Sequence, residues 1–235
     1  TSETEPTRNS FRLTLTARPG GSERVQTLTI TDDRATFWNA FDYTGTPTNV
    51  LTLPTFSPSP STSGTVIQVE VCVGVSSWWT ASAVAADPDA NCVDRGGSWI
   101  GAGLGPASWK TQAQARANFL PSGVTAAQVE GLRITIKRAD NSQWENPQSP
   151  TISIPILVQR RVNLRTGDPV RTSLDGNPAS PGETVPGTTT NSLSADVLGV
   201  WGKTATASNS ASYQYRHAIT GVRVQKGPSG VKAPG

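Results

Sequence analysis

The stretch that decides the fold runs from Leu120 to Val162 and reads LPSGVTAAQVEGLRITIKRADNSQWENPQSPTISIPILVQRRV. Apolar and polar side chains alternate over residues 132–137 and again over residues 152–158, which is the period of a strand with one buried face. Turn residues at 139–142 separate the two runs. Two strands with one solvent-exposed face each favour antiparallel pairing on a common core, so we expect the other strands to pack on this pair.

Similar alternating runs predict the remaining strands. Residues 11–17 (FRLTLTA) are expected to form a hairpin with residues 25–31 across the turn PGGS. Further predicted strands lie at 50–53, 66–73 and 190–201, with one or two more within 210–226. Residues 163–190 are rich in turn residues and predict a long connection or short edge strands.

Helical signals are few and short. Single turns or short helices are predicted at residues 35–41 (ATFWNAF), 110–119 (KTQAQARANF) and 125–131 (TAAQVEG), the last of which is capped by Thr125. With 22 glycines and 18 prolines, the composition favours many turns and strands. The sequence therefore predicts an all-β antiparallel sandwich with one or two short helices.

Composition and charge exclude several functional classes. Charged residues make up 16% of the chain, and the abundance of hydroxyl side chains is common in exported proteins. The net charge of +3 comes from scattered Lys and Arg, so we expect no nucleic-acid partner. No apolar run reaches the roughly 18 residues of a membrane span, so we expect no membrane insertion. Because no signal peptide is present, we expect a mature form or a fragment of a secreted protein.

Cys72 and Cys92 are the only cysteines. Their spacing, in a stretch rich in Gly, Ser and Asp, predicts a disulfide that closes a long loop and contributes roughly 3 kcal/mol. The alternative is a pair of reduced, buried thiols. A structural zinc site is not expected, because the chain offers a single, distant histidine, His217.

Residues 74–119 hold four of the seven tryptophans. We interpret this segment as a long insertion between two sheet strands, closed by the disulfide. Exposed aromatic side chains stack on sugar rings or anchor protein partners. The candidate residues for binding a glycan or a host protein are therefore Trp78, Trp79 and Trp99. The alternative is a small secondary core beneath a long loop.

Residues capable of catalysis show no recognisable spacing. No G-x-S-x-G motif accompanies His217, and Glu70, Glu130 and Glu145 do not have the pattern of a paired-carboxylate site. The glycines of GGSWIGAGLG do not form a phosphate-binding motif. We therefore expect no enzyme activity, no catalytic residues and no cofactor.

One acidic loop carries alternating oxygen ligands. Asp87, Asp89, Asn91 and Asp94 have the spacing of side chains in calcium loops, although the glycine and the closing glutamate of an EF-hand are missing. A bound calcium ion and a solvated acidic loop are the two alternatives.

Several segments resemble a known family. FRLTLTA followed by LTITDD resembles the opening of DUF11-type repeats from large surface proteins of Gram-positive bacteria, and residues 120–147, 186–197 and 215–235 are similar to segments of the actinobacterial versions. The resemblance implies an immunoglobulin-like sandwich repeated along a wall-anchored stalk or adhesin. It also implies an extracellular location at the bacterial cell surface or cell wall.

The resemblance and the patterns together give a domain plan and a leading hypothesis. Residues 11–215 are expected to form the sandwich, with 1–10 as an N-terminal linker or edge segment and 216–235 as a terminal strand and linker toward a next repeat. The chain would be a structural module of an extracellular fibre, stalk or adhesin, with neighbouring copies as partners, in tandem or by strand exchange. The alternative is a carbohydrate- or protein-binding domain that uses the Trp-rich insertion.

The resemblance also suggests a covalent cross-link. Surface-stalk domains of related kinds carry a Lys–Asn isopeptide bond, and the family-like positions here are Lys226 in the tail and Asn191 in TTTNSLSAD. Asp32 or Asp33 would supply the acid that polarises the amide. Because the tail resembles the opening strand of a next repeat, Lys226 would react with Asn191 of a neighbouring copy. The alternative is an exposed lysine and an ordinary turn asparagine.

Overall fold

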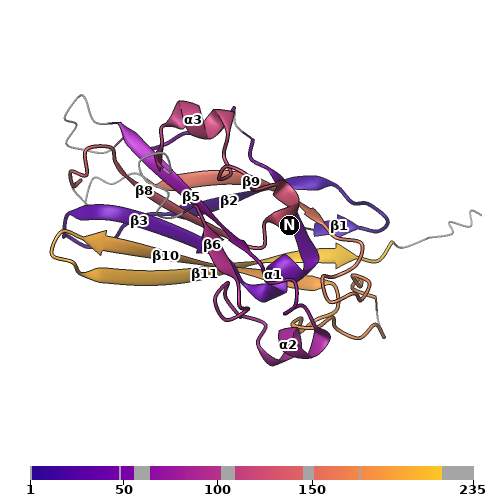
Figure 1. Cartoon of the computed structure of the whole chain (residues 1–235). Helices are drawn as coiled ribbons and strands as arrows, with labels where there is room; N and C mark the ends of the chain where they lie inside the picture. Colours follow the sequence, from indigo (N-terminus) through magenta and orange to yellow (C-terminus); the bar gives the residue numbers. More distant parts are fainter. Residues whose placement is uncertain are drawn as a thin grey trace, which may run out of the picture.

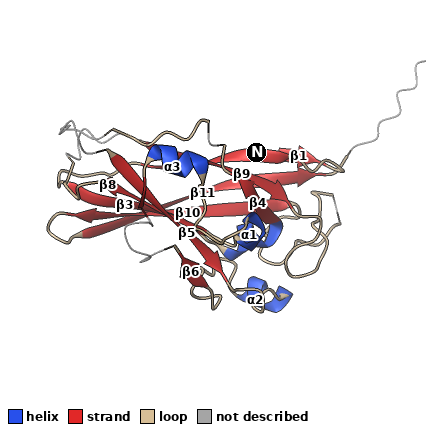
Figure 2. Cartoon of the chain, turned by 45° about the horizontal axis from the view of Figure 1, so that its top comes forward, coloured by secondary structure: helices blue, strands red, loops and turns tan. Residues whose placement is uncertain are grey.

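The computed structural model describes residues 2–47, 49–55, 64–101, 109–144, 151–174 and 176–218, which form two curled β-sheets packed face to face (Figure 1, Figure 2). The large sheet contains, in spatial order, β1 (Ser2–Thr4), β11 (Thr204–Arg216), β10 (Thr188–Gly199), β3 (Val25–Asp32), β8 (Leu132–Arg138), β5 (Thr65–Val73) and β6 (Ser98–Ile100), and β7 (Trp109–Lys110) also pairs with β5. The small sheet contains β2 (Ser10–Ala17), β9 (Ile152–Arg160) and β4 (Phe41–Gly45). Within the described chain, β1 and β11 are parallel and the other pairs are antiparallel. The prediction of an all-β sandwich is confirmed.

The two strands of the stretch from residue 120 to residue 162 lie in different sheets, so their predicted pairing is wrong. β8 pairs with β3 and β5, whereas β9 pairs with β2 and β4. Their side chains still share one core, because Ile134 and Ile136 of β8 and Ile154 and Ile156 of β9 are all fully buried. Strands that face each other across a sandwich have the same alternation as paired strands, so the pattern identifies the buried face but not the partner.

The predicted hairpin of residues 11–17 with residues 25–31 is wrong for a related reason. β2 belongs to the small sheet, and β3 pairs with β8 and β10 in the large sheet, so the turn between β2 and β3 connects the two layers. Residues 50–53, predicted as a strand, have no strand structure, although Leu51 and Leu53 are buried.

The described residues contain three short α-helices and a 3₁₀ turn: α1 (Ala35–Ala40), α2 (Ala81–Ala86), α3 (Gln112–Ala117) and η2 (Ala126–Gln128). Thr111 and Gln114 form a capping box at the start of α3. At η2, the Oε1 atom of Gln128 accepts hydrogen bonds from the backbone N–H and the hydroxyl of Thr125. The predicted helix beginning at Thr125 is therefore a single 3₁₀ turn.

An aromatic cluster joins the two sheets beside α1. Trp38 is fully buried in α1, and its neighbour Phe37 stacks on Phe41 with ring centroids 4.7 Å apart. Phe41 packs edge-on against Tyr213 of β11 at 4.8 Å, and Phe11 of β2 stacks on the same tyrosine at 5.4 Å. These contacts fix the position of β2 relative to β11.

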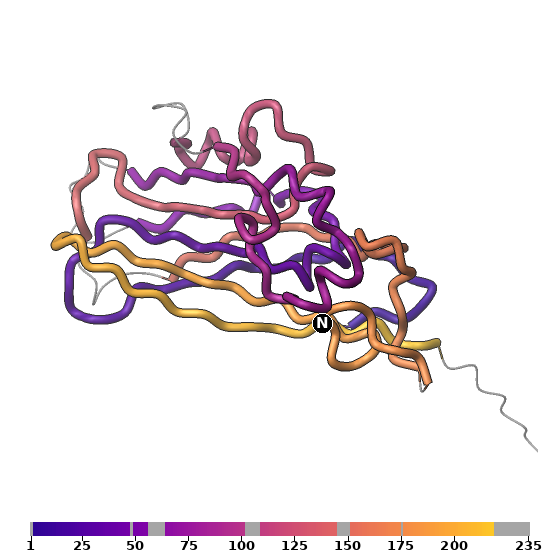
Figure 3. Tube along the Cα trace, turned by 60° about the horizontal axis from the view of Figure 1, so that its bottom comes forward, coloured from indigo at the N-terminus to yellow at the C-terminus, as the bar shows by residue number. Residues whose placement is uncertain are grey.

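The described residues of the insertion, 74–101 and 109–119, lie between β5 and β8, which are neighbours in the large sheet (Figure 3). The insertion extends the sheet, because β6 and β7 both pair with β5. The predicted disulfide is present between Cys72 and Cys92, with Cα atoms 5.8 Å apart. Arg95 is 2% exposed and donates a hydrogen bond of 2.8 Å to the backbone oxygen of Asp33, which holds the insertion on the core.

The N-terminal residues form an edge strand of the large sheet and then cross to the small sheet. β1 lies beside the last residues of β11, and the Oε2 atom of Glu3 accepts hydrogen bonds from Arg160 Nε at 3.2 Å and from the Tyr213 hydroxyl at 2.5 Å. Residues 5–9 then connect β1 in the large sheet to β2 in the small sheet. The crossing therefore lies at the end of the sandwich where β11 ends.

Candidate functional site

A free strand edge is present on one side of the small sheet. Among the described strands β2 pairs with β9 alone, so the backbone N–H and C=O groups along its other edge have no strand partner. The inward side chains Phe11 and Leu13 are partly buried, whereas Leu15 is 3% exposed. The first half of β2 thus leaves apolar surface open.

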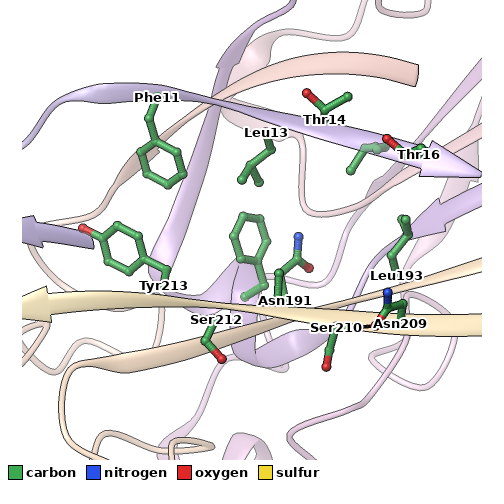
Figure 4. A pocket seen from close by; sticks show the side chains of 13 residues that line it. Phe11, Leu13, Thr14, Thr16, Asn191, Leu193, Asn209, Ser210, Ser212 and Tyr213 are labelled. Carbon is green, nitrogen blue, oxygen red and sulfur yellow. Dashed lines mark hydrogen bonds between the residues drawn. The ribbon is translucent and has the colours of Figure 1, made fainter. Parts of the chain in front are cut away.

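Across from this edge, the β10–β11 hairpin presents a small-residue face. In β11, hydroxyl side chains occupy one face, and the other carries Ala205, Ala207, Asn209 and Ala211. In the hairpin register Asn191 lies opposite Ala211 and Leu193 opposite Asn209, so these four share a face. Figure 4 shows Asn191 and Leu193 pointing toward β2, and Ser210 and Ser212 pointing away from it. β11 is nonetheless exposed from Thr204 to Ser212, so this inner face is not covered by the described residues.

A groove of about 280 Å³ lies between β2 and the hairpin. The residues that line it include five large apolar or aromatic side chains and one amide: Phe11, Leu13, Phe37, Leu193, Tyr213 and Asn191 (Figure 4). The groove therefore combines a mostly apolar wall with an unpaired strand edge, and one amide group lies in that wall.

Asn191 brings this amide to a buried carboxyl group. Its Nδ2 donates to Asp32 Oδ2 at 2.9 Å, and Trp38 Nε1 donates to Asp32 Oδ1 at 3.2 Å. Asp32 is fully buried at the end of β3, and Asn191 Oδ1 is also buried, with no hydrogen-bond partner among the described residues. Two of the residues predicted for a cross-link are therefore in contact. Lys226 lies outside the described residues.

The surroundings of Asp32 favour the neutral carboxyl. Burial raises its pKa from 3.8 to about 7, because the carboxylate would lose its hydration in the core. The hydrogen bond from Asn191 opposes this rise in pKa, and the charge of Asp33 adds to it. A neutral carboxyl can donate a hydrogen bond to an amide oxygen, which a carboxylate cannot do.

Asp33, the other acid considered from the sequence, has a different role. Its Oδ2 accepts a hydrogen bond from the backbone N–H of Cys92 at 2.9 Å, so it anchors the disulfide loop. A Cβ added at Gly131 would lie 2.9 Å from the Cβ atoms of both Asp33 and Cys72, which shows how closely the backbone packs there. Asp32 is thus the acid that contacts Asn191.

The three candidate ligand-binding tryptophans contact other protein groups. Trp79 is 8% exposed, and the guanidinium of Arg95 lies 5.0 Å from its ring centroid. Trp78 packs edge-on against Trp79 at 5.3 Å, and Trp99 is partly buried beside a second arginine. These contacts resemble the secondary core that was the alternative interpretation, while Trp78 and Trp99 keep part of their surface open.

The acidic loop after α2 has its own hydrogen bonds. Asp87, Asp89 and Asp94 are exposed, and Asn91 Oδ1 accepts from the backbone N–H groups of Val93 and Asp94 at 2.8 and 3.0 Å. In the described part of the chain, no group of three or more His, Cys, Asp or Glu side chains is arranged to hold a metal ion. A bound calcium ion and a solvated acidic loop stay the two alternatives for this segment.

The other ionisable residues considered for catalysis have separate partners. Glu70 and Glu130 each form an ion pair with an arginine, and His217 is paired with Glu5. Glu145 lies outside the described residues.

Comparison with protein-family models, with curated proteins and with solved structures finds no match to this chain. Of the helices in the described ranges, none is long and apolar enough to cross a membrane. The sequence analysis missed the groove, although a signal was present: alanines alternate with Ser and Thr over residues 204–212, which marks one face of small apolar side chains.

Proposed function

We propose that the chain is a structural module of an extracellular bacterial fibre, stalk or adhesin, and that neighbouring copies join by adding a strand to β2. The observation that carries this proposal is the free edge of β2 opposite the uncovered alanine face of β11. An added strand would pair its backbone with β2 and bury apolar side chains on the hairpin. Burying Phe11 and Leu13 would supply the hydrophobic part of the binding free energy.

The occupant that we assign to the groove is the segment 219–235 of a neighbouring copy. Within it, Val222, Val224 and Lys226 alternate with polar residues, so in an extended conformation these three side chains share one face. Two valines match the apolar wall of the groove. The segment is long enough, because a strand rises about 3.3 Å per residue.

The added strand comes from a neighbouring copy and not from the same chain, because residues 5–9 cross between the two sheets at the end of the groove. Residues 5–9 pass from β1 to β2 where β11 ends, and Glu5 holds the residues that follow β11. The chain's own tail would have to pass around this crossing to enter the groove. Because the groove of one copy would receive the segment 219–235 of the next, the contacts would propagate head to tail and build a fibre.

Two further observations support an extracellular structural role. The disulfide between Cys72 and Cys92 is a feature of proteins from oxidising compartments. The outer face of the β10–β11 hairpin is rich in Ser and Thr, which keeps a long exposed surface soluble without charge. The alternative, glycan or protein binding by the insertion, receives less support because Trp79 is 8% exposed.

A peptide-binding experiment tests strand addition. A fluorescent peptide of residues 219–235 that carries Lys226→Arg is titrated into the full chain with Val222→Asp and Val224→Asp, so that the chain's own segment leaves the groove open, and fluorescence anisotropy measures binding. A peptide with Val222→Asp and Val224→Asp is the matched control. We expect saturable binding of the first peptide and at least tenfold weaker binding of the second, which would place two charges on the apolar wall. Equal binding of both, or binding of neither, would refute the proposal.

A further inference from the structure

We propose that Trp201, at the tip of the β10–β11 hairpin, is the stacking platform of a binding site for neutral pyranose sugars, and that Glu23 positions it. The site lies at the end of the large sheet opposite β1, because β11 begins beside the tip at Thr204 and pairs with β1 near its other end (Figure 1). It shares no residue with the groove beside β2, so the proposal does not depend on strand addition.

The first observation is the exposure of the indole. Trp201 is 82% exposed, and no large apolar side chain in the described ranges is more exposed. A single exposed apolar side chain needs no explanation by itself. Trp201 differs from such a case in two respects, because its backbone is held in place and polar side chains surround it.

The second observation is the fixed backbone of the tip. The Gly202 N–H donates to the Gly199 carbonyl oxygen at 3.1 Å, which closes a β-turn with Val200 and Trp201 at its centre. The Val200 N–H donates to the carbonyl oxygen of Arg24 at 3.2 Å, so the turn is also tied to the segment before β3. The position of the Trp201 backbone is therefore set before a ligand arrives, and binding has less conformational entropy to lose.

Glu23 adds a side-chain anchor to this turn. Its Oε1 atom accepts a hydrogen bond from the Trp201 N–H at 3.0 Å. A Cβ added at Gly199 would lie 2.4 Å from the carboxylate carbon of Glu23, so the glycine lets the carboxylate lie against the turn. Glu23 is thus a positioning residue for Trp201.

The third observation is the chemistry of the surface beside the indole. A hollow of about 500 Å³ lies there, within the range of about 300–1,000 Å³ that is usual for small-molecule sites. Two apolar and four polar side chains line it: Val200, Trp201, Ser22, Glu23, Arg24 and Gln143. The polar four supply a hydroxyl, a carboxylate, a guanidinium and an amide, which together can donate to and accept from the hydroxyl groups of a ligand.

These features fit a sugar ring better than other ligands. One face of a pyranose consists of C–H groups, which pack on an indole because the face of the aromatic ring is negative. The lining carries one carboxylate and one guanidinium, so their charges cancel, and a neutral sugar fits better than a uronic acid or a phosphate. A protein or a lipid surface would need further apolar contacts around the tryptophan, and Val200 is the only other apolar side chain in the lining.

The test measures binding of neutral hexasaccharides to the full chain by isothermal titration calorimetry. The panel contains cellohexaose, mannohexaose and chitohexaose, and a hexamer of galacturonic acid is the acidic counterpart. We expect saturable binding of at least one neutral hexasaccharide and at least tenfold weaker binding by Trp201→Ala. Trp201→Tyr keeps an aromatic face and should retain most of the affinity. Trp78→Ala, in the insertion, is the matched control and should bind as the wild type does.

Two variants test the role of Glu23. Glu23→Ala removes the acceptor for the Trp201 N–H and should weaken binding of the same hexasaccharide. Glu23→Gln keeps an oxygen that can accept this hydrogen bond and should restore binding. Equal affinity of Glu23→Ala and the wild type would overturn the positioning role.

Several results would overturn the sugar site itself. Binding of no neutral hexasaccharide, or equal binding by the wild type and Trp201→Ala, would refute it. Binding of the galacturonic acid hexamer alone would exclude the neutral ligand class. Loss of binding in Trp78→Ala, with full binding in Trp201→Ala, would move the site to the insertion. If no sugar binds but vesicles of phosphatidylcholine and phosphatidylglycerol retain the wild type and not Trp201→Ala, the tip contacts a lipid surface instead.

Discussion

Replacing Asp32 by asparagine should remove a pH dependence of stability that this one carboxyl creates. The substitution keeps the size of the side chain. Its oxygen can still accept from Trp38 Nε1, and its new N–H₂ group can donate to Asn191 Oδ1, which is buried without a partner among the described residues. The variant is therefore expected to fold, and it differs from the wild type mainly in having no proton to lose.

The magnitude follows from the pKa of Asp32, which burial raises from 3.8 to about 7. Between these values the folded chain holds a proton that the unfolded chain has released, so stability falls as pH rises. The contribution is fully present below the unfolded pKa of 3.8 and is lost as pH rises through the folded pKa of about 7. One pKa unit corresponds to about 1.4 kcal/mol, so the total loss is about 4 kcal/mol.

Urea denaturation of both proteins at several pH values between about 4 and 8 measures this loss, since the free energy of unfolding is obtained at each pH. Both chains carry Lys226→Arg, which prevents any cross-link from changing the stability. Subtracting the two curves cancels titrating groups that both chains share. We expect the difference to change by about 4 kcal/mol in favour of the variant from low to high pH. A difference that stays constant across the range would refute the buried, neutral state of Asp32.

Three further predictions concern the scaffold. Replacing Cys72 and Cys92 by alanine should lower the free energy of unfolding by about 3 kcal/mol in urea, and an unchanged midpoint would contradict the loop-closure argument. Gly187→Ala should destabilise by about 3 kcal/mol or more, because its φ is +68° and a Cβ would lie 2.5 Å from a backbone oxygen, whereas Gly20→Ala, with nothing within 4 Å, is the control. Adding calcium or a chelator should leave Tm unchanged, because Asn91 Oδ1 already accepts two backbone hydrogen bonds; a calcium-dependent rise would establish a metal site.

The sequence predicts local features of this fold well. Alternation at 132–137 and 152–158 identifies two real strands, residues 110–119 contain a real short helix, and Thr125 stands at the start of a real helical turn. The disulfide between the two cysteines is also confirmed. Each of these features depends on interactions within a few residues or on a single pair of side chains, so a single sequence contains the information.

The sequence does not predict the strand partners, because these depend on contacts between residues far apart in the chain. β2 and β3 are joined by a Gly-rich turn and yet belong to different sheets, and β8 and β9, which follow each other in the chain, also belong to different sheets. A turn of a few residues serves both to reverse a chain within a sheet and to carry it across a sandwich. The apolar pattern is the same in the two cases. Only the packing of the whole core decides between them.

The candidate site depends both on local sequence features and on contacts between residues far apart in the chain. The resemblance suggested Asn191 and Asp32, but their contact depends on the pairing of β10 with β3, which the strand patterns do not predict. The groove is open because no described element covers the alanine face of β11. A sequence pattern cannot distinguish a covered face from an open one. This is why the residues could be suggested from the sequence and the site could not.

Burial of Asp32 is unfavourable for the stability of the folded chain at neutral pH. With the carboxyl's pKa raised to about 7 by burial, the side chain lowers the stability of the folded chain at neutral pH. Asparagine at this position would accept the Trp38 hydrogen bond without this penalty. Residues that break the rules of packing without a local gain are expected at functional sites, and Asp32 contacts the amide of Asn191 beside an open groove.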